Sequence, residues 1–453
     1  MKQTGLSVGC WPVRAGLGLA WLALCAGMAC AQPLPVPRPA NAPDLRRSAP
    51  PPQADDPLGA LVARQLASQA PVVIGLKLAE DAKQTRFTVE LSDSIDVHVF
   101  TLTNPNRVII DMPEVLWRVS DAARPSGRAA VKAYRYGLFR QGNSRFVIDL
   151  NKPVRVGAPQ ILPPDGGMGF RLVLDLTPTT PDAFAANAGW PKGVGAPGVG
   201  GPTRTALAPP AVRPAAGQKV IVVDAGHGGI DPGTHGANGV LEKDIVLAVA
   251  TRLRTNLDAT GRYKVVLTRD RDVFVSLRDR VTIARAAHAN LFVSLHADSN
   301  DHREIRGASV YTLSEDASDK EAAKLAEKEN MSDAIAGIDL SDEDSPVASI
   351  LIDLAQRDTM NRSMRFAETV LASLPNATLV RPSSPHRAAG FAVLKAPDIP
   401  AVLIELGYLT NARDEDEMAT AAWRGDVAKA VATAVDRHFS GETLPAARQA
   451  ANP

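Results

Sequence analysis

From residue 218 onward, short apolar strands alternate with amphipathic helices along the chain. The expected strands have the length of buried strands and are rich in Val, Ile and Leu, and they lie at 220–224, 263–268, 291–295, 307–312 and 401–405. The expected helices lie at 242–257, 276–288, 365–373 and 421–438. Such alternation is typical of a mainly parallel sheet flanked by helices. We therefore expect an α/β domain over residues 218–440.

Residues that can bind a metal stand where three of these strands end. His227 follows the first strand after a glycine-rich turn, His296 follows the third strand, and Glu405 closes the last one. Parallel strands present their carboxyl ends at one edge of a sheet, so these side chains are expected to meet there. Glu242 begins the helix after His227 and can fold over the same edge. A lone strand-end histidine is more often structural, but four such residues together indicate a site.

Two histidines and two carboxylates match the donor set of a hydrolytic zinc site. Zinc binds imidazole nitrogen and carboxylate oxygen, and a catalytic zinc has three protein ligands and one open position. We therefore assign His227, Glu242 and His296 as the ligands of one zinc ion. The remaining carboxylate, Glu405, is assigned as the general base, because an unpaired acid ending so apolar a strand costs about 1–3 kcal/mol.

Two aspartates close to these ligands are candidates for orienting the histidine rings. Asp224 ends the first strand, and Asp298 lies shortly after His296. Carboxylates commonly accept a hydrogen bond from the imidazole nitrogen that does not bind the metal. Either aspartate could equally cap a turn, so both interpretations stay open from the sequence.

The first 31 residues have the pattern of an export signal. Lys2 and Arg14 precede an apolar run at 15–29 that is too short to span a bilayer. Ala29 and Ala31 give the small-x-small pattern of a cleavage site, so we predict cleavage after Ala31 and a periplasmic location. No later run is apolar and long enough to predict a transmembrane segment.

Cysteine usage and net charge exclude several classes of function. All cysteines lie in the predicted export signal, at Cys10, Cys25 and Cys30. The mature chain would therefore have no disulfide, no thiolate metal ligand and no cysteine nucleophile. The formal net charge of +1 gives no indication of nucleic-acid binding.

Residues 71–177 have the pattern of an all-β domain. The segment 145–150 repeats the pattern of 86–91, and the segment 171–176 repeats that of 107–112. This duplication predicts two similar antiparallel sheets packed as a β-sandwich. Because the region has no clustered carboxylates of catalytic spacing, we interpret it as a binding or targeting module, with a purely structural domain as the alternative.

Segments rich in Pro, Ala and Gly separate the expected domains. Residues 32–70 and 178–217 are predicted to be extended linkers, because proline favours an extended chain over a compact coil. The last residues, 441–453, are predicted to be a flexible tail.

A long charged segment, residues 318–362, interrupts the strand–helix alternation of the α/β domain. Its first part, 318–335, is predicted to be a helix in which Ala322, Leu325 and Glu329 share one face. An acidic turn at 339–344 and a second amphipathic run at 350–355 follow. Excursions of this length in a compact domain are functional or disordered. From charge alone, a solvated helical hairpin is the favoured interpretation.

Four blocks of sequence resemble the signature motifs of a known enzyme family. They are Asp224-Ala-Gly-His-Gly-Gly229, Glu242-Lys-Asp244, Ser294-Leu-His-Ala-Asp298 and Ile404-Glu-Leu-Gly-Tyr-Leu-Thr-Asn411, in this order. By these blocks residues 218–440 resemble the zinc-dependent N-acetylmuramoyl-L-alanine amidases of the amidase-3 family. The duplicated β-region resembles the AMIN domain that targets such enzymes to peptidoglycan.

This resemblance implies a substrate, a cellular role and the same roles for the site residues. The substrate would be peptidoglycan, cut at the amide between the lactyl group of N-acetylmuramic acid and the L-alanine of the stem peptide. The role would be cell-wall remodelling and daughter-cell separation, with recruitment to the division septum. Two histidines and one glutamate would bind zinc, and the C-terminal glutamate would be catalytic.

The resemblance also implies a role for the charged insertion. Division-associated members of the family carry a helix at this place that occludes the zinc, so Glu329, or alternatively Glu327, would fill the open zinc position. Activator proteins with a LytM domain are the implied partners. The rival interpretations are another zinc hydrolase of the cell wall (a peptidase or a carbohydrate deacetylase) and an inactive peptidoglycan-binding protein.

Overall fold

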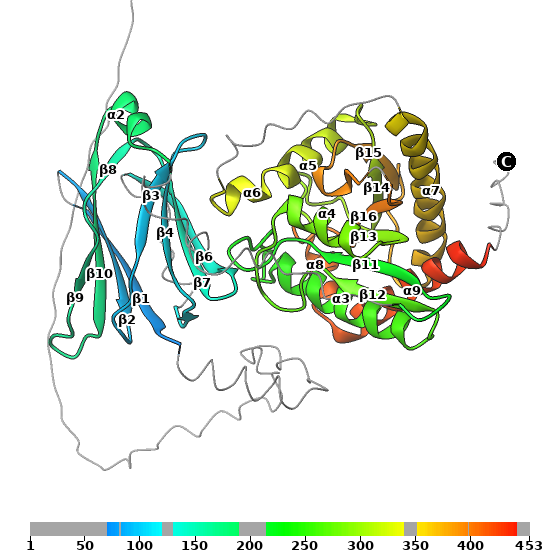
Figure 1. Cartoon of the computed structure of the whole chain (residues 1–453), viewed down its shortest axis with the longest axis horizontal. Coiled ribbons are helices and arrows are strands. Elements are labelled where there is room, and N and C mark those ends of the chain that lie inside the picture. Colours follow the sequence, from blue (N-terminus) through cyan, green and yellow to red (C-terminus); the bar gives the residue numbers. More distant parts are fainter. Residues whose placement is uncertain are drawn as a thin grey trace, which may run out of the picture. The chain divides into compact units, whose positions relative to one another are not determined.

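The computed structural model describes residues 70–80, 83–119, 130–189, 214–338, 351–396 and 398–441. These residues belong to one compact unit of the chain, 62–453. The predicted export signal, all but the last residue of the 32–70 linker, the acidic turn at 339–344 and most of the predicted tail lie outside the described residues. In Figure 1 the blue-to-cyan part of the chain is built almost entirely of strands, and the green-to-red part combines strands with helices.

The N-terminal part forms two sheets, which we call the β-domain. One sheet has the strand order β5-β1-β2-β10-β8, with β9 paired to β10, and the other has the order β3-β4-β7-β6. The strands are β1 (Val72–Glu80), β2 (Thr85–Leu91), β3 (His98–Leu102), β4 (Arg107–Pro113), β5 (Leu116–Trp117), β6 (Val131–Arg140), β7 (Asn143–Leu150), β8 (Val154–Val156), β9 (Gln160–Leu162) and β10 (Phe170–Pro178). All pairs except β1 with β5 are antiparallel.

The duplicated segments form the centre of each sheet. Strands β2 and β10 pair in the first sheet, and β4 and β7 pair in the second. Inward-facing apolar side chains of both sheets share one core, in which the rings of Phe87 and Phe146 lie 4.9 Å apart. Sheets that face each other across such a core form a sandwich, so the predicted β-sandwich is confirmed.

The prediction of an extended linker over residues 178–217 is wrong at the start of this segment. Residues Pro181–Ala186 form helix α2. Thr180 caps the start of this helix, because its side chain accepts a hydrogen bond from the backbone N–H of Ala183. Proline fits the first turn of a helix because its missing N–H would have no partner there. Phe184 is buried in the β-sandwich core, so burial of this one ring outweighs the extended tendency of the flanking prolines.

The C-terminal part is built on one mixed sheet of strand order β12-β11-β13-β16-β14-β15. The strands are β11 (Lys219–Ala225), β12 (Tyr263–Leu267), β13 (Leu291–His296), β14 (Ser309–Leu313), β15 (His386–Ala389) and β16 (Ala401–Glu405). Only β14 with β16 is an antiparallel pair; the other pairs are parallel. The predicted α/β fold with a mainly parallel sheet is therefore confirmed.

Helices cover both faces of this sheet, as the alternation along β11 shows. Ile221 and Val223 pack with α3, α7 and α9, whereas Val220 and Val222 pack with α4 and α5. The helices are α3 (Glu242–Asp258), α4 (Leu277–Ala286), α5 (Lys320–Asn330), α6 (Ser332–Ile335), α7 (Leu351–Ser373), α8 (Ala412–Met418) and α9 (Ala421–Ser440). Because both faces are covered, the central strands are apolar on both faces until the residues near their carboxyl ends. No helix in the described ranges is long and apolar enough to cross a membrane.

The charged insertion differs from the hairpin that its charge favours. The helix predicted at 318–335 is α5 followed by α6, with a break at Met331. From Leu351 on, the predicted run at 350–355 is the start of α7, and later turns of that helix bury Phe366 and Val370 in the main core. Ala322, Leu325 and Glu329 are all buried, so the helix face that they were predicted to share packs against the domain and is not solvated.

Candidate metal centre

The structure brings the four predicted residues to one edge of the sheet. His227 follows β11, His296 ends β13 and Glu405 ends β16 directly opposite His296 in the strand register. Glu242 is the first residue of α3, and its Oε1 lies 3.1 Å from His227 Nε2 and 3.2 Å from His296 Nδ1. The convergence expected from parallel strands is therefore present.

Glycines at two positions allow this close approach. A Cβ atom on Gly226 would lie 2.5 Å from the ring of His296. A Cβ atom on Gly233 would lie 2.7 Å from both His227 and Glu242, and Gly233 also has a φ of +66°. Only glycine adopts such a turn without steric cost, so the glycine-rich loop is required by the packing of the imidazoles and the carboxylate.

Glu242 is fully buried and is held as a carboxylate by backbone donors. Its Oε1 accepts a hydrogen bond from the N–H of Ala297 (2.9 Å), and its Oε2 accepts one from the N–H of Thr234 (2.8 Å). Burial alone raises the pKa of Glu242, but the His227 and His296 imidazoles lower it well below its usual value. The side chain is therefore fixed in the ionised form that binds a cation.

Glu329 reaches the same two imidazoles from helix α5. Its Oε2 lies 3.1 Å from His296 Nδ1 and 3.5 Å from His227 Nε2. In the described part of the chain, His227, His296 and Glu329 offer ligand atoms that lie within 4.8 Å of one another. Glu327, the alternative from the sequence, is exposed. The geometry therefore favours Glu329 as the carboxylate that faces the site.

The charges around the imidazoles fit a cation. Burial lowers the pKa of His227, but the neighbouring carboxylates, Glu242 first among them, raise it well above its usual value. Burial likewise lowers the pKa of His296, and its carboxylate neighbours, chiefly Glu329, raise it to about 10. These directions mean that the carboxylates stabilise positive charge between the two rings, which is what a divalent metal ion supplies.

Buried polar atoms without hydrogen-bond partners also indicate that this site fits a cation. Among the described side chains, His227 Nε2, Glu329 Oε1 and Glu405 Oε1 are buried without a hydrogen-bond partner. Buried polar groups without partners are costly and usually mark a functional site. Nitrogen and carboxylate donors in this mixture are the ligands that zinc prefers, so the residues present fit a zinc ion.

Asp231 is a site residue that the sequence analysis missed. Its Oδ2 lies 2.9 Å from His227 Nδ1 and accepts a hydrogen bond from the Ser332 hydroxyl at 2.5 Å. Because Asp231 occupies Nδ1, Nε2 is the ring nitrogen of His227 that faces Glu242 and Glu329. The signal was available, because Asp231 lies in the same glycine-rich loop as His227.

The two predicted orienting aspartates lie elsewhere in the network. Asp224 is buried and accepts hydrogen bonds from Arg280 (2.6 Å), Thr268 (2.6 Å) and Ser294 (2.7 Å). Arg280 in turn donates to the carbonyl of His227 at 2.8 Å, so Asp224 supports the loop and not the imidazole. Asp298 Oδ1 accepts a hydrogen bond from Thr234 (3.0 Å) and pairs with Lys328 of helix α5.

Glu405 is fully buried beside this network. Its Oε2 accepts a hydrogen bond from the N–H of Asp298 at 3.0 Å, and its Oε1 has no hydrogen-bond partner. Burial and the Asp298 carboxylate raise the pKa of Glu405 well above its usual value. A carboxylate with a raised pKa accepts a proton more readily than an ordinary one.

Helices α5 and α6 cover the imidazoles. Ala322 and Leu325 pack into the apolar cluster on the α4 face of the sheet, and Glu321 forms an ion pair with Arg381 (2.6 Å). Asp333 accepts a hydrogen bond from the N–H of Leu277 at 3.0 Å. The space left beside the imidazoles is about 10 Å³, which is the room of one water molecule. A peptide substrate therefore has no access to the imidazoles in this conformation.

A buried group of imidazoles and carboxylates at the carboxyl edge of a mainly parallel sheet fits the site of a metal-dependent hydrolase. Comparison with known proteins agrees. Residues 221–437 match the family model described as N-acetylmuramoyl-L-alanine amidase, and residues 75–174 match the AMIN domain.

Relatives match over most of their length. The chain is 34% identical to the N-acetylmuramoyl-L-alanine amidase AmiC of Escherichia coli, over 82% of this chain and 91% of that protein. It is 32% identical to AmiC of Neisseria meningitidis serogroup B, over 88% of this chain and 97% of that protein. The solved structure of the amidase AmiC2 of Nostoc punctiforme covers 49% of this chain and 97% of its own, with 27% identity and a TM-score of 0.35.

The chain therefore belongs to the N-acetylmuramoyl-L-alanine amidase family and carries an N-terminal AMIN domain, in an AmiC-like organisation. The resemblance given by the four sequence blocks is confirmed. The roles of the individual site residues stay predictions.

Proposed function

We propose that this protein is a zinc-dependent hydrolase of the amide bond between N-acetylmuramic acid and the L-alanine of peptidoglycan stem peptides. The observation that carries the proposal is the convergence of His227, Glu242 and His296 on one buried point at the sheet edge. The family membership supplies the substrate class, because the AmiC relatives are N-acetylmuramoyl-L-alanine amidases by name.

In this proposal His227, Glu242 and His296 hold one zinc ion per catalytic domain. When bound there, zinc supplies Lewis acidity that activates water and polarises the scissile carbonyl. Asp231 fixes the ring of His227 through Nδ1, and the N–H groups of Thr234 and Ala297 fix Glu242. These contacts hold the three donors in place, which lowers the cost of arranging them for each turnover.

Glu405 is the proposed general base. Its Oε1 has no hydrogen-bond partner, so this oxygen is available to take a proton from the attacking water. The N–H of Asp298 holds Oε2 and fixes the orientation of the carboxylate. After the amide carbon is attacked, the same carboxyl group can return the proton to the departing alanine nitrogen, which must be protonated to leave.

Removal of the metal tests the proposed dependence on zinc. We expect a chelator to abolish release of stem peptides from purified sacculi, and we expect added zinc to restore it, because the site has no other source of Lewis acidity in this proposal. Metal analysis of the untreated protein should find one zinc per chain. Full turnover by metal-free protein would overturn the zinc assignment.

The closed site is proposed to be autoinhibited by helix α5. Glu329 contacts both imidazoles, and the space beside them is about 10 Å³. An activator that binds the displaced helix would shift the closed–open equilibrium by its differential affinity for the open form. A LytM-domain protein is the proposed activator, by family resemblance.

The variant Glu329→Ala is expected to raise turnover of sacculi by about tenfold or more in the absence of an activator. The reason is that charge-assisted hydrogen bonds are worth about 1.5–3 kcal/mol, and each 1.4 kcal/mol changes a population tenfold. Glu327→Ala is the matched control, because Glu327 is the exposed glutamate on the same helix. Equal turnover by Glu329→Ala and the unaltered protein would contradict autoinhibition by this carboxylate.

The cellular setting is part of the same proposal. The predicted export signal ending at Ala31 would deliver the chain to the periplasm, and the AMIN domain, proposed at 71–177, would bring it to peptidoglycan at the division septum. The catalytic domain, proposed at 218–440 with its insertion at 318–362, would then act in cell-wall remodelling and daughter-cell separation.

A further inference from the structure

The two sheets of the β-domain have equivalent strands but different burial. Strand β2 of the first sheet alternates between buried and partly exposed residues, as expected for a sheet with one face in solvent. Its counterpart β7 in the second sheet is buried at nearly every position. Strand β4, next to β7, is buried in the same way. The outer face of the second sheet is therefore covered.

The equivalent ion pairs of the two sheets show the same difference. In the first sheet Arg86 pairs with Asp175 across neighbouring strands, and these side chains are 51% and 31% exposed. In the second sheet Arg145 pairs with Asp111 in the same way, and these side chains are 4% and 0% exposed. A pair of this kind is not buried without a reason, because desolvation of two charges is costly.

The cover is residues 334–337 of the charged insertion, at the end of helix α6. Three arginines of the second sheet, which we call the arginine face, donate to its backbone carbonyls. Arg107 donates to Ala334, Arg135 Nε donates to Ile335 at 2.7 Å, and Arg145 Nη1 donates to Ala336 at 3.2 Å and to Gly337 at 2.9 Å. Hydrogen bonds from guanidinium groups are about twice as strong as neutral ones.

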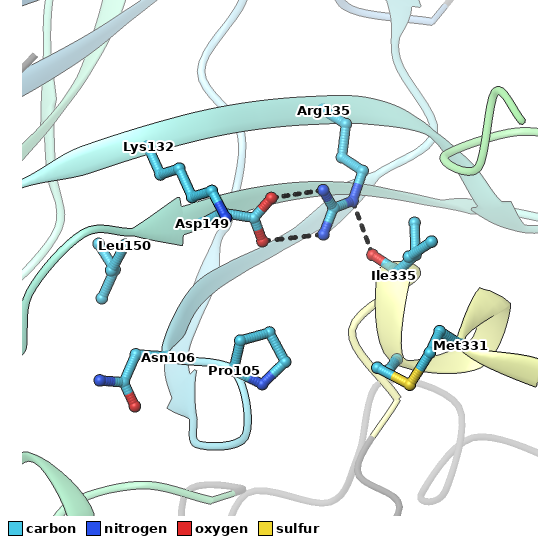
Figure 2. Close-up of a pocket in the computed structure, with 9 residues that line it drawn as sticks. Pro105, Asn106, Lys132, Arg135, Asp149, Leu150, Met331 and Ile335 are labelled. Carbon is cyan, nitrogen blue, oxygen red and sulfur yellow. Dashed lines mark hydrogen bonds and ion pairs between the residues drawn. The ribbon is translucent and has the colours of Figure 1, made fainter. Parts of the chain in front are cut away.

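Figure 2 shows the middle contact of this set. The guanidinium of Arg135 lies between the carboxylate of Asp149, which it meets at 2.6 and 2.9 Å, and the carbonyl of Ile335. The carboxylate holds the guanidinium in place, so little side-chain freedom is lost when the carbonyl binds. Arg145 is held in the same way by Asp111, at 2.6 and 2.8 Å.

Apolar packing closes the rest of the contact. Ile109 and Val147 point to the outer face of the sheet, and both are fully buried together with Ala336. A Cβ atom on Gly337 would lie 2.6 Å from Cδ1 of Ile109. The backbone of the insertion therefore lies directly on the sheet at Gly337.

The contact adjoins the occluded site in sequence and in space. Glu329 lies at the end of α5, and residues 334–337 follow after the short helix α6. Between them, Ser332 donates to Asp231, the partner of His227. Movement of residues 334–337 away from the sheet would remove the anchor that follows Glu329 in the chain.

We propose that the arginine face of the β-domain clamps the insertion in its closed position, so that the proposed wall-targeting domain also controls access to the site. This inference rests on the proposed autoinhibition by α5. In this arrangement, any event that occupies the arginine face releases residues 334–337 and favours withdrawal of Glu329.

The test compares two variants that break the clamp from opposite sides. Arg135→Ala removes one donor from the sheet and leaves only the partly exposed Asp149 behind. Gly337→Ala keeps all three arginines and places a methyl group against Ile109. Arg86→Ala is the control for the first, because it also breaks a cross-strand arginine–aspartate pair, but in the first sheet, where both side chains are partly exposed. Gly441→Ala is the control for the second, because Gly441 has a similar φ of +71° and no neighbour within 4 Å of the added Cβ.

The measurements are hydrogen–deuterium exchange of residues 320–338 in the full chain and turnover of sacculi without an activator. Both clamp variants are expected to raise exchange in this segment by about tenfold, the effect of losing one charge-assisted hydrogen bond, and to raise turnover in parallel. Both controls should leave exchange of the segment unchanged.

Unchanged exchange in Arg135→Ala and Gly337→Ala would overturn the clamp. This outcome is distinct from failure of the proposed function. If Glu329→Ala raises turnover while the clamp variants change neither exchange nor turnover, α5 inhibits without help from the β-domain. If exchange rises in both clamp variants and turnover does not, even with Glu329→Ala, the clamp holds the insertion but autoinhibition is wrong.

Discussion

The variant Glu405→Gln is expected to lose about 10²–10⁴-fold in turnover of sacculi while it retains its zinc. A loss of this magnitude is typical when an enzyme loses its general base. Glutamine has the shape of glutamate, and its carbonyl oxygen can accept the N–H of Asp298 as Glu405 does now. The fold and the metal ligands should therefore remain, and the change isolates the proton transfer.

The measurement is best made in a Glu329→Ala background. The site is covered in the closed conformation, so an open background gives a turnover from which a large loss can be measured. Zinc content and the circular dichroism spectrum serve as controls for the metal and the fold. Turnover close to that of the background protein would show that another group takes the proton.

His227→Ala is expected to lose both zinc and turnover. The imidazole is one of three proposed metal ligands, and its Nε2 is the atom that faces Glu242 and Glu329. A catalytic zinc site with two protein ligands holds its metal far more weakly than one with three. The matched control is His302→Ala, because His302 is a histidine whose side chain is 72% exposed.

The two variants separate binding of the metal from the chemistry. Zinc content, measured on the purified proteins, should fall for His227→Ala and stay at one per chain for Glu405→Gln and His302→Ala. Full zinc content in His227→Ala would contradict its assignment as a ligand. Loss of zinc in Glu405→Gln would instead place Glu405 among the ligands.

Much of the metal centre follows from simple rules about strands. The apolar runs before His227, His296 and Glu405 predict buried strands, and the parallel pairing of β13 with β16 brings His296 and Glu405 opposite each other. The edge at which the side chains meet is set by strand direction, which strand–helix alternation already predicts. The position of Glu242 follows because helix α3 begins immediately over this edge.

Other features depend on contacts that local pattern does not contain. The antiparallel direction of β14 depends on the path of the chain between strands, and the apolar pattern is the same for either direction. The role of Asp231 depends on the turn at Gly228 and Gly229, both with positive φ, which brings its carboxylate back to the His227 ring. The aspartates chosen from sequence proximity bind an arginine and a lysine in the structure.

The buried outer face of the second sheet of the β-domain is the feature that depends most clearly on residues far apart in the sequence. Arg145 and Asp111 have the sequence pattern of an outward-facing pair, and their equivalents in the first sheet are exposed. Their burial comes from a segment that includes Ala336, 191 residues after Arg145 in the chain. Charge in the insertion favoured a solvated hairpin, yet Glu321, Lys328 and Glu329 all find partners on the domain that they cover.

Mass spectrometry of the products released from purified sacculi tests the central claim most directly. Zinc-loaded Glu329→Ala protein is expected to release stem peptides that begin with a free L-alanine amino terminus and to leave the glycan strands unbroken. Treatment with a chelator should stop this release. Release of acetate, or of peptides cut within the stem with L-alanine still attached to the glycan, would contradict the account.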